Sequence, residues 1–306
     1  MADSIIADFA QFLLDEGKSP NTVTTYGRVL SKLDAWLQEQ LPTTSLITLS
    51  ARDLLAYFNF LRTSARAKPA TLNLSRGAMS AFYKWTREQG LTDENPARKI
   101  KAVVSVKGAP KALSEAQMDR LIEAAMRCLR KRDGAMVLVL LMTGLRESEL
   151  CQLLVEDVDF KHRTMTVYAG KGGKYRQLPL TAEICGVLSS YVNGERAELA
   201  GKLKRPHKRN NLFLGRRGPI ARQTVFSVVK TVGKLAGIEG CHPHQLRHTY
   251  ATIILNKTGD LTAVSALLGH SSIATTQIYT RPTQELLAER VQSALGHKVT
   301  RRSATE

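Results

Sequence analysis

The sequence predicts a mainly α-helical protein with a small antiparallel β-sheet, an α+β fold, on two observations. Apolar residues recur every three or four positions over most of the 306 residues, which is the period of an amphipathic helix. The period changes at residues 165–168 and 175–178, which flank the glycine-rich turn 170–173 and predict a β-hairpin. The length favours two domains, because single hydrophobic cores stop growing at about 250–300 residues.

Four amphipathic helices are expected within the first hundred residues. Their apolar faces lie at residues 5–13, 23–37, 54–61 and 72–85. Ser19 and Ser50 precede the second and third helices as N-caps, and Pro20 occupies the first helical position that proline favours. The fourth helix is expected to run from about Pro69 to near Gly90.

Residues 97–112 are poor in large apolar side chains and rich in Lys and Arg, which predicts a basic linker between two domains. Such a segment is either a solvated tether or a stretch of chain that lies against a phosphate backbone. Beyond it, a capping box at Ser114 opens a helix, and an apolar helix follows at residues 136–142. The hairpin comes next, and helical patterns return from about residue 182.

The chain is strongly basic, with 44 Lys and Arg against 27 Asp and Glu and a net charge of +17. Both predicted domains carry part of this excess. A polyanionic partner is therefore expected, and nucleic acid is favoured over an anionic membrane surface.

Several classes of protein are disfavoured by the same sequence. The apolar run at residues 135–142 is far shorter than the ~20 residues that a membrane span needs. The N-terminus has no signal-peptide pattern, so we expect a cytoplasmic protein. The four cysteines are too widely spaced for a zinc knuckle or a CxxC redox pair.

Four short segments carry groups that could do chemistry. They are TGLRESEL at residues 143–150, the hairpin turn with Lys171, HQLRH at residues 244–248, and LGHSSIATTQIY at residues 268–279. Taken singly, each has an ordinary explanation as a surface ion pair, a solvated turn or helix packing. His244 and His248 have the i, i+4 spacing of a metal pair, but glutamine stands where the HExxH zinc motif has glutamate.

In combination, these residue types fit phosphodiester chemistry. Arginine matches the non-bridging oxygens of a phosphate bidentately, and tyrosine can attack phosphorus and hold a covalent intermediate. A lysine on a hairpin can protonate a leaving oxygen. No acidic metal-binding cluster is visible, so no cofactor is expected.

The motifs TGLRESEL, GKGGKYR, HQLRHTYAT and LLGHSSIATTQIYT, in this order, resemble those of the tyrosine recombinases of the Xer and phage-integrase family. The resemblance spans almost the entire chain. It implies a helical core-binding (SAM-like) DNA-binding domain at residues 1–96, the basic linker, and a catalytic domain at residues 113–306. The residues that follow Tyr279 predict a C-terminal tail helix at about residues 284–296, and two basic domains joined by a basic linker suggest a C-shaped clamp on DNA.

The resemblance implies six catalytic residues: Arg146, Lys171, His244, Arg247, His270 and Tyr279. Arg146 and Arg247 would clamp the scissile phosphate, and His270 would bind a non-bridging oxygen. Glu149 matches the acidic residue that orients this site in the family. His248 is expected to support the site by packing.

The resemblance also implies how protons move. Tyr279 would attack the phosphate and form a 3′-phosphotyrosyl link, assisted by His244. Lys171 would be the general acid for the leaving 5′ oxygen. The link preserves the energy of the broken bond, so rejoining would need no ATP.

The expected partner is double-stranded DNA with a short inverted-repeat core site. By resemblance, the protein would form a tetrameric synapse on it, with or without a second recombinase, for Xer-like resolution or integration. Two regions are candidates for reading the DNA, although a solvated face explains each almost equally well. The candidate residues are Lys68, Asn73, Arg76, Lys84, Arg216, Arg217 and Arg222.

Two other functions compete with recombination. A catalytically silent DNA-binding accessory protein of the same fold is disfavoured because none of the six catalytic positions is replaced. A type IB topoisomerase-like enzyme would use related chemistry only to relax DNA. Relaxation of DNA without a recombination site would separate this activity from strand exchange.

Overall fold

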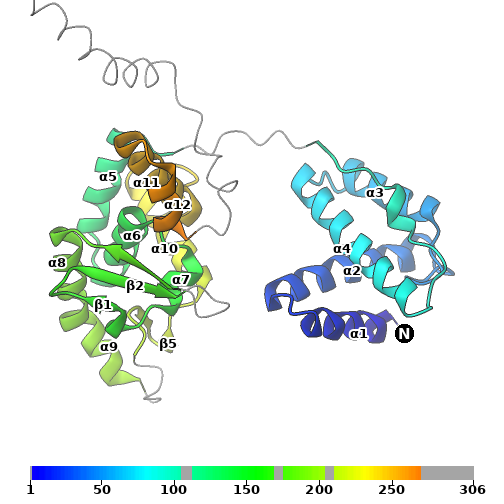
Figure 1. Cartoon of the computed structure of the whole chain (residues 1–306), viewed down its shortest axis with the longest axis horizontal. Coiled ribbons are helices and arrows are strands. Elements are labelled where there is room, and N and C mark those ends of the chain that lie inside the picture. The colour runs from blue at the N-terminus through cyan, green and yellow to red at the C-terminus, as the bar shows by residue number, and fades with distance from the viewer. Residues whose placement is uncertain (1, 105–111, 169–174, 204–209, 270–306) are drawn as a thin grey trace, which may run out of the picture. The chain divides into compact units, whose positions relative to one another are not determined.

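The computed structural model describes residues 2–104, 112–168, 175–203 and 210–269 (Figure 1). The chain divides into two compact units, residues 1–107 and 108–306, and each unit has its own hydrophobic core. Helices dominate the described residues, and the described strands are short and antiparallel, which confirms the predicted fold class. None of the described helices is long and apolar enough to cross a membrane.

The first unit contains the four predicted helices. They are α1 (Ala2–Asp15), α2 (Pro20–Gln40), α3 (Ala51–Thr63) and α4 (Pro69–Glu88). Ser50 and Asp53 form a capping box at the start of α3, in which the Ser50 N–H donates to the Asp53 carboxylate at 2.9 Å. Aromatic rings fill the core: Phe9 and Phe82 are buried and meet edge to face, with 5.3 Å between ring centroids.

The chain that follows α4 returns along that helix. The short 3-10 helix η1 (Pro96–Lys99) leads to Ile100, which is buried. Arg76 Nε donates to the Ile100 carbonyl at 2.7 Å, and the Asn73 side chain both donates to and accepts from the Val103 main chain, at 2.8 and 2.9 Å. The first half of the predicted linker is therefore held against α4. Residues 105–111 lie outside the described residues.

The second unit surrounds one apolar helix, α6. Its helices are α5 (Glu115–Met126), α6 (Lys131–Thr143), α7 (Glu147–Gln152), α8 (Ala182–Tyr191), α9 (Ala197–Lys202), α10 (Arg222–Leu235), α11 (Pro243–Thr258) and α12 (Leu261–Leu268). A 3-10 turn, η2 (Val155–Asp157), and a π-helical turn, η3 (Val192–Arg196), complete the helical segments. Every residue of α6 from 134 to 141 is buried, because α5, α7, α8, α10 and α11 pack around it.

A three-stranded antiparallel sheet carries the predicted hairpin. Its order is β1 (Val158–Asp159), β2 (Thr164–Tyr168), β3 (Tyr175–Pro179). Met165 pairs with Leu178 and Val167 pairs with Arg176, and the three apolar members of these pairs are buried. Residues 169–174 of the hairpin lie outside the described residues.

The structure adds strands that sequence periodicity did not predict. These are β1 and a second, two-stranded sheet of β4 (Leu214–Gly215) and β5 (Gly218–Pro219). Strands of two residues are too short to show an alternating pattern. The turn between β4 and β5 consists of Arg216 and Arg217, both exposed.

Candidate active site

The segment TGLRESEL forms a sharp corner between α6 and α7. Gly144 caps α6 in the left-handed conformation, with φ of 64°. A Cβ atom at this position would lie 2.5 Å from Cδ1 of Tyr250 and 2.9 Å from Cδ2 of Leu268, so only glycine fits. The chain then turns through buried Leu145 and brings Arg146 to the N-cap of α7.

Glu149 on α7 is the centre of the candidate site. Its side chain is 9% exposed. Oε2 accepts from the Arg146 N–H at 2.7 Å and from Arg176 Nη2 at 2.9 Å. Oε1 accepts from Arg146 Nη1 at 3.1 Å and from Arg176 Nη1 at 3.0 Å. Arg247 Nη1 lies 3.8 Å from Oε2. We call Glu149 and these three arginines the Glu149 cluster.

The charge of Glu149 is set by its neighbours. Burial raises the pKa of this carboxyl, but the hydrogen bonds from Arg176 and Arg146 and their positive charges outweigh burial. The pKa of Glu149 is therefore below its usual value, and the group is ionised at neutral pH.

The two predicted clamp arginines differ in exposure. Arg247 on α11 is buried, and it donates from Nη1 to the Gly144 carbonyl at 2.6 Å and from Nη2 to the Leu268 carbonyl at 2.7 Å. The Arg146 side chain is 42% exposed. The cluster thus combines an arginine fixed within the core with one that reaches solvent, and a phosphate at this surface would meet a net positive charge.

His244 and His248 lie one turn apart on α11 but in different environments. His244 is exposed, and its pKa is lowered by partial desolvation and by the positive charge of Arg247. It is therefore neutral at pH 7 and can accept a proton. His248 is buried. Within the described part of the chain, no three His, Cys, Asp or Glu residues are grouped closely enough to hold a metal ion.

Three of the six predicted catalytic residues, Lys171, His270 and Tyr279, lie outside the described residues, as does the predicted tail helix at about 284–296. The described chain ends at Gly269, which follows α12 and directly precedes His270. The other three catalytic candidates and Glu149 all belong to the second unit, and α6, α7 and α11 bring them together.

The structure adds one residue that the sequence reasoning missed. Arg176 lies on β3, its side chain is 11% exposed, and it makes more bonds to Glu149 than any other described side chain. Its signal in the sequence was its place in the motif GKGGKYR. The motif predicts a role for its lysine, but nothing in it distinguishes the arginine from a solvated one.

The predicted DNA-reading residues have different surroundings. Lys68 and Lys84 are exposed, and Lys84 lies 3.7 Å from Glu88. Asn73 and Arg76 instead bind the main chain of residues 100–103, as described above, which gives them a structural role in the first unit. Arg222 at the start of α10 forms an ion pair with Glu147, next to Arg146. Burial raises the pKa of Glu147, but the bond from Arg222 contributes to a net lowering.

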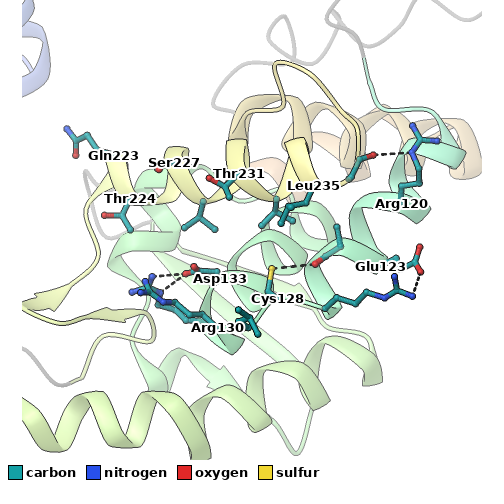
Figure 2. Close-up of a pocket in the computed structure, with 17 residues that line it drawn as sticks. Arg120, Glu123, Cys128, Arg130, Asp133, Gln223, Thr224, Ser227, Thr231 and Leu235 are labelled. Carbon is teal, nitrogen blue, oxygen red and sulfur yellow. Dashed lines mark hydrogen bonds and ion pairs between the residues drawn. The ribbon is translucent and has the colours of Figure 1, made fainter.

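A cavity of about 990 Å³ lies elsewhere, between α5, the start of α6 and α10 (Figure 2). Figure 2 shows polar side chains such as Arg120, Glu123, Asp133 and Ser227 along its walls. Arg120 Nε donates to the Ala236 carbonyl at 3.1 Å. None of the described catalytic candidates lines this cavity, so the surface at the Glu149 cluster is the better candidate for the active site.

Comparison with known proteins gives a consistent result. Residues 111–285 match the model of the phage integrase family, and residues 5–93 match that of the phage integrase N-terminal SAM-like domain. The chain is 35% identical over 294 residues to tyrosine recombinase XerA of Pyrococcus furiosus, with 96% of this chain and 95% of the relative covered. It is 33% identical over 288 residues to tyrosine recombinase XerD of Listeria monocytogenes, with 92% and 95% covered. A crystal structure of XerA recombinase is similar at 30% identity and a TM-score of 0.54, with 95% and 98% covered.

Proposed function

The chain belongs to the phage integrase family and is a site-specific tyrosine recombinase, and we propose that it cleaves and rejoins duplex DNA through a 3′-phosphotyrosyl intermediate at Tyr279. The observation that carries this proposal is the Glu149 cluster. In it, a buried carboxylate holds Arg146, and Arg247 lies beside the same carboxylate. Two arginines that meet at one carboxylate, one of them reaching solvent, are suited to the non-bridging oxygens of one phosphate.

The proposed clamp stabilises charge that develops during transfer. Arg247 is held by two main-chain carbonyls, so its position costs no reorganisation when the reaction occurs. Arg146 keeps an exposed guanidinium for the DNA, and its main-chain N–H and Nη1 are bound by Glu149. We assign His270 to a non-bridging oxygen of the same phosphate, from its position in the family motif.

The proposed cleavage step moves two protons. The Tyr279 oxygen attacks phosphorus as its proton passes to His244, which the lowered pKa keeps neutral and able to accept it. The bond from phosphorus to the 5′ oxygen breaks, and Lys171 protonates that oxygen. In rejoining, a 5′ hydroxyl attacks the phosphotyrosyl ester and the protons return. The ester retains the energy of the broken bond, so the route uses no cofactor and no ATP.

We propose the domain roles and partners that the family membership supports. Residues 1–96 would bind the core site, residues 97–112 would connect the domains, and residues 113–306 would carry catalysis and the tail helix. The partner would be double-stranded DNA with inverted repeats, on which copies of the chain, with or without a second recombinase, form a tetramer in the cytoplasm. The biological role would be Xer-like resolution or integration.

The first experiment uses nicked suicide duplexes built from inverted repeats that flank the gene. The readout is a protein–DNA adduct that resists SDS, with Tyr279→Phe as the comparison. An adduct with the wild type and none with the variant is expected, and an adduct that survives in the variant would rule out Tyr279. Strand exchange on paired sites, compared with relaxation of DNA without a site, then tests recombination against topoisomerase-like activity.

A further inference from the structure

Arg176 belongs to the Glu149 cluster but has no role in the route proposed above. It reaches the cluster from β3, whereas Glu149 and Arg146 belong to the α7 corner and Arg247 to α11. Of the four hydrogen bonds to the Glu149 carboxylate described above, two come from Arg176 and two from Arg146. A carboxylate offers about four acceptor positions, so these bonds saturate it.

Saturation of the carboxylate has a consequence for the clamp. Arg247 Nη1 stays 3.8 Å from Oε2, beyond hydrogen-bond range, and donates to a carbonyl instead. Arg146 bonds to the carboxylate with Nη1. If Arg176 were absent, two acceptor positions on a buried carboxylate would be open. Among the described residues, the other cations beside this carboxylate are Arg146 and Arg247, the two groups that the DNA phosphate needs.

We propose that Arg176 is a positioning residue for strand cleavage, which occupies and neutralises Glu149 so that Arg146 and Arg247 remain available to the scissile phosphate. This proposal rests on the proposed function of the two clamp arginines. Arg176 does not itself touch the DNA: its side chain is 11% exposed, and its guanidinium is bound within the protein. Its loss would lower the net positive charge of the cluster and redirect the remaining guanidinium groups toward Glu149.

A second contact ties Arg176 to the end of α12. Its Nε donates to the Leu267 carbonyl at 2.8 Å, next to the Leu268 carbonyl that binds Arg247. Its guanidinium also packs against Gly269, where a Cβ atom would lie 2.8 Å from Nη1. These contacts give Arg176 a structural role as well. The test must therefore separate the electrostatic effect from a loss of packing.

The test is a double-mutant cycle read by single-turnover cleavage of the suicide duplex. Arg176→Met should lower the cleavage rate about 100-fold, the loss expected for misplaced catalytic groups, with less effect on DNA affinity. Arg176→Met combined with Glu149→Gln should cleave faster than Arg176→Met alone, because a neutral amide does not attract the clamp arginines. Arg120→Met, which removes an arginine that also bonds a distant carbonyl, is the matched control and should cleave at the wild-type rate.

The pH dependence gives a second readout that a purely structural role would not move. Without Arg176, the pKa of buried Glu149 should rise, and acid should neutralise the carboxylate as Glu149→Gln does. The cleavage rate of Arg176→Met relative to the wild type should therefore increase as the pH falls from 8 to 5. His244 also titrates in this range, and its pKa responds to Arg247 and Arg146. The double variant retains His244 and lacks the Glu149 carboxylate, so it is the reference for this effect.

A double variant that cleaves no faster than Arg176→Met, together with a constant ratio across pH, would overturn the proposal and leave Arg176 a packing role. If Arg176→Met does not fold, Arg176→Lys takes its place in the cycle. It keeps the charge but not the planar two-bond contact, and Glu149→Gln should again restore part of the rate. Cleavage that persists in Tyr279→Phe would refute the proposed nucleophile, while the comparison of Arg176 variants would still be readable.

Discussion

Gly144 is the position where a single added methyl group should damage both the fold and the candidate site. Its φ of 64° is left-handed, and alanine in that region costs about 1–2 kcal/mol. The new Cβ would also lie 2.5 Å from Tyr250 Cδ1, whereas ordinary contacts are 3.4–4 Å. Overpacking of this kind costs about 1–3 kcal/mol. Gly144→Ala should therefore destabilise the second unit by about 2–5 kcal/mol.

Gly237 offers a matched control. Its φ of 68° is nearly the same, but nothing lies within 4 Å of its would-be Cβ. Gly237→Ala should therefore show only the backbone cost. The difference in the free energy of unfolding between the two variants isolates the cost of the clash. The middle of the overpacking range, about 2 kcal/mol, corresponds to about 4–8 °C in melting temperature for a unit of this size.

Thermal unfolding followed by circular dichroism measures this difference, and the suicide-duplex assay measures its effect on the site. The Gly144 carbonyl accepts from Arg247, so Gly144→Ala should slow cleavage more than Gly237→Ala does. Equal melting temperatures for the two variants would refute the clash. Equal cleavage rates would refute the link between this corner and Arg247.

Three further predictions follow from the described contacts. Glu149→Gln should destabilise the protein by about 3 kcal/mol at pH 7, because it leaves Arg176 without a charged partner. Because folding lowers the pKa of Glu149, its contribution to the free energy of unfolding is complete above about pH 4.5 and is lost as the pH falls through the folded-state pKa. Denaturant unfolding should therefore show that the stabilities of the variant and the wild type converge below about pH 4.5. Because the pKa of His244 is lowered, the rate of wild-type cleavage should stay constant from pH 8 to 7 and fall only below about pH 6.5. A rate that begins to decline above pH 7 would contradict the role of His244 as proton acceptor. Ser50→Ala should cost the first unit about 1 kcal/mol by removing the cap of α3, with no change of cleavage rate at saturating enzyme, as measured by thermal unfolding and the adduct assay.

Local patterns predicted the described elements well where each element has its own signal. The predicted N-cap at Ser50 and the predicted capping box at Ser114 are present, and the hairpin strands lie at residues 164–168 and 175–179. The packing of residues 100–103 was not predicted. Asn73 and Arg76 hold residues 100–103 on α4, and no pattern in residues 97–103 shows this, because a main-chain carbonyl carries no residue-type signal.

The sequence predicted most residues of the candidate site but not which of their side chains contact one another. Arg146, His244 and Arg247 stand in short motifs whose residue types indicate a phosphate, and Glu149 follows from the family resemblance. Arg176 was missed as part of the site. An arginine on a strand beside a hairpin turn is usually solvated, and only its tertiary partners distinguish it.

The sequence by itself determined the helical fold class, the hairpin, the basic character of the chain and the order of motifs that identifies the family, because each depends on residue type and short-range spacing. The tertiary structure alone decided which charges meet. Glu149 and Arg176 are 27 positions apart, and Arg247 and Gly144 are 103 apart. Their bonds exist because α6, α11 and β3 pack around one core, and packing over such separations leaves no period in the sequence.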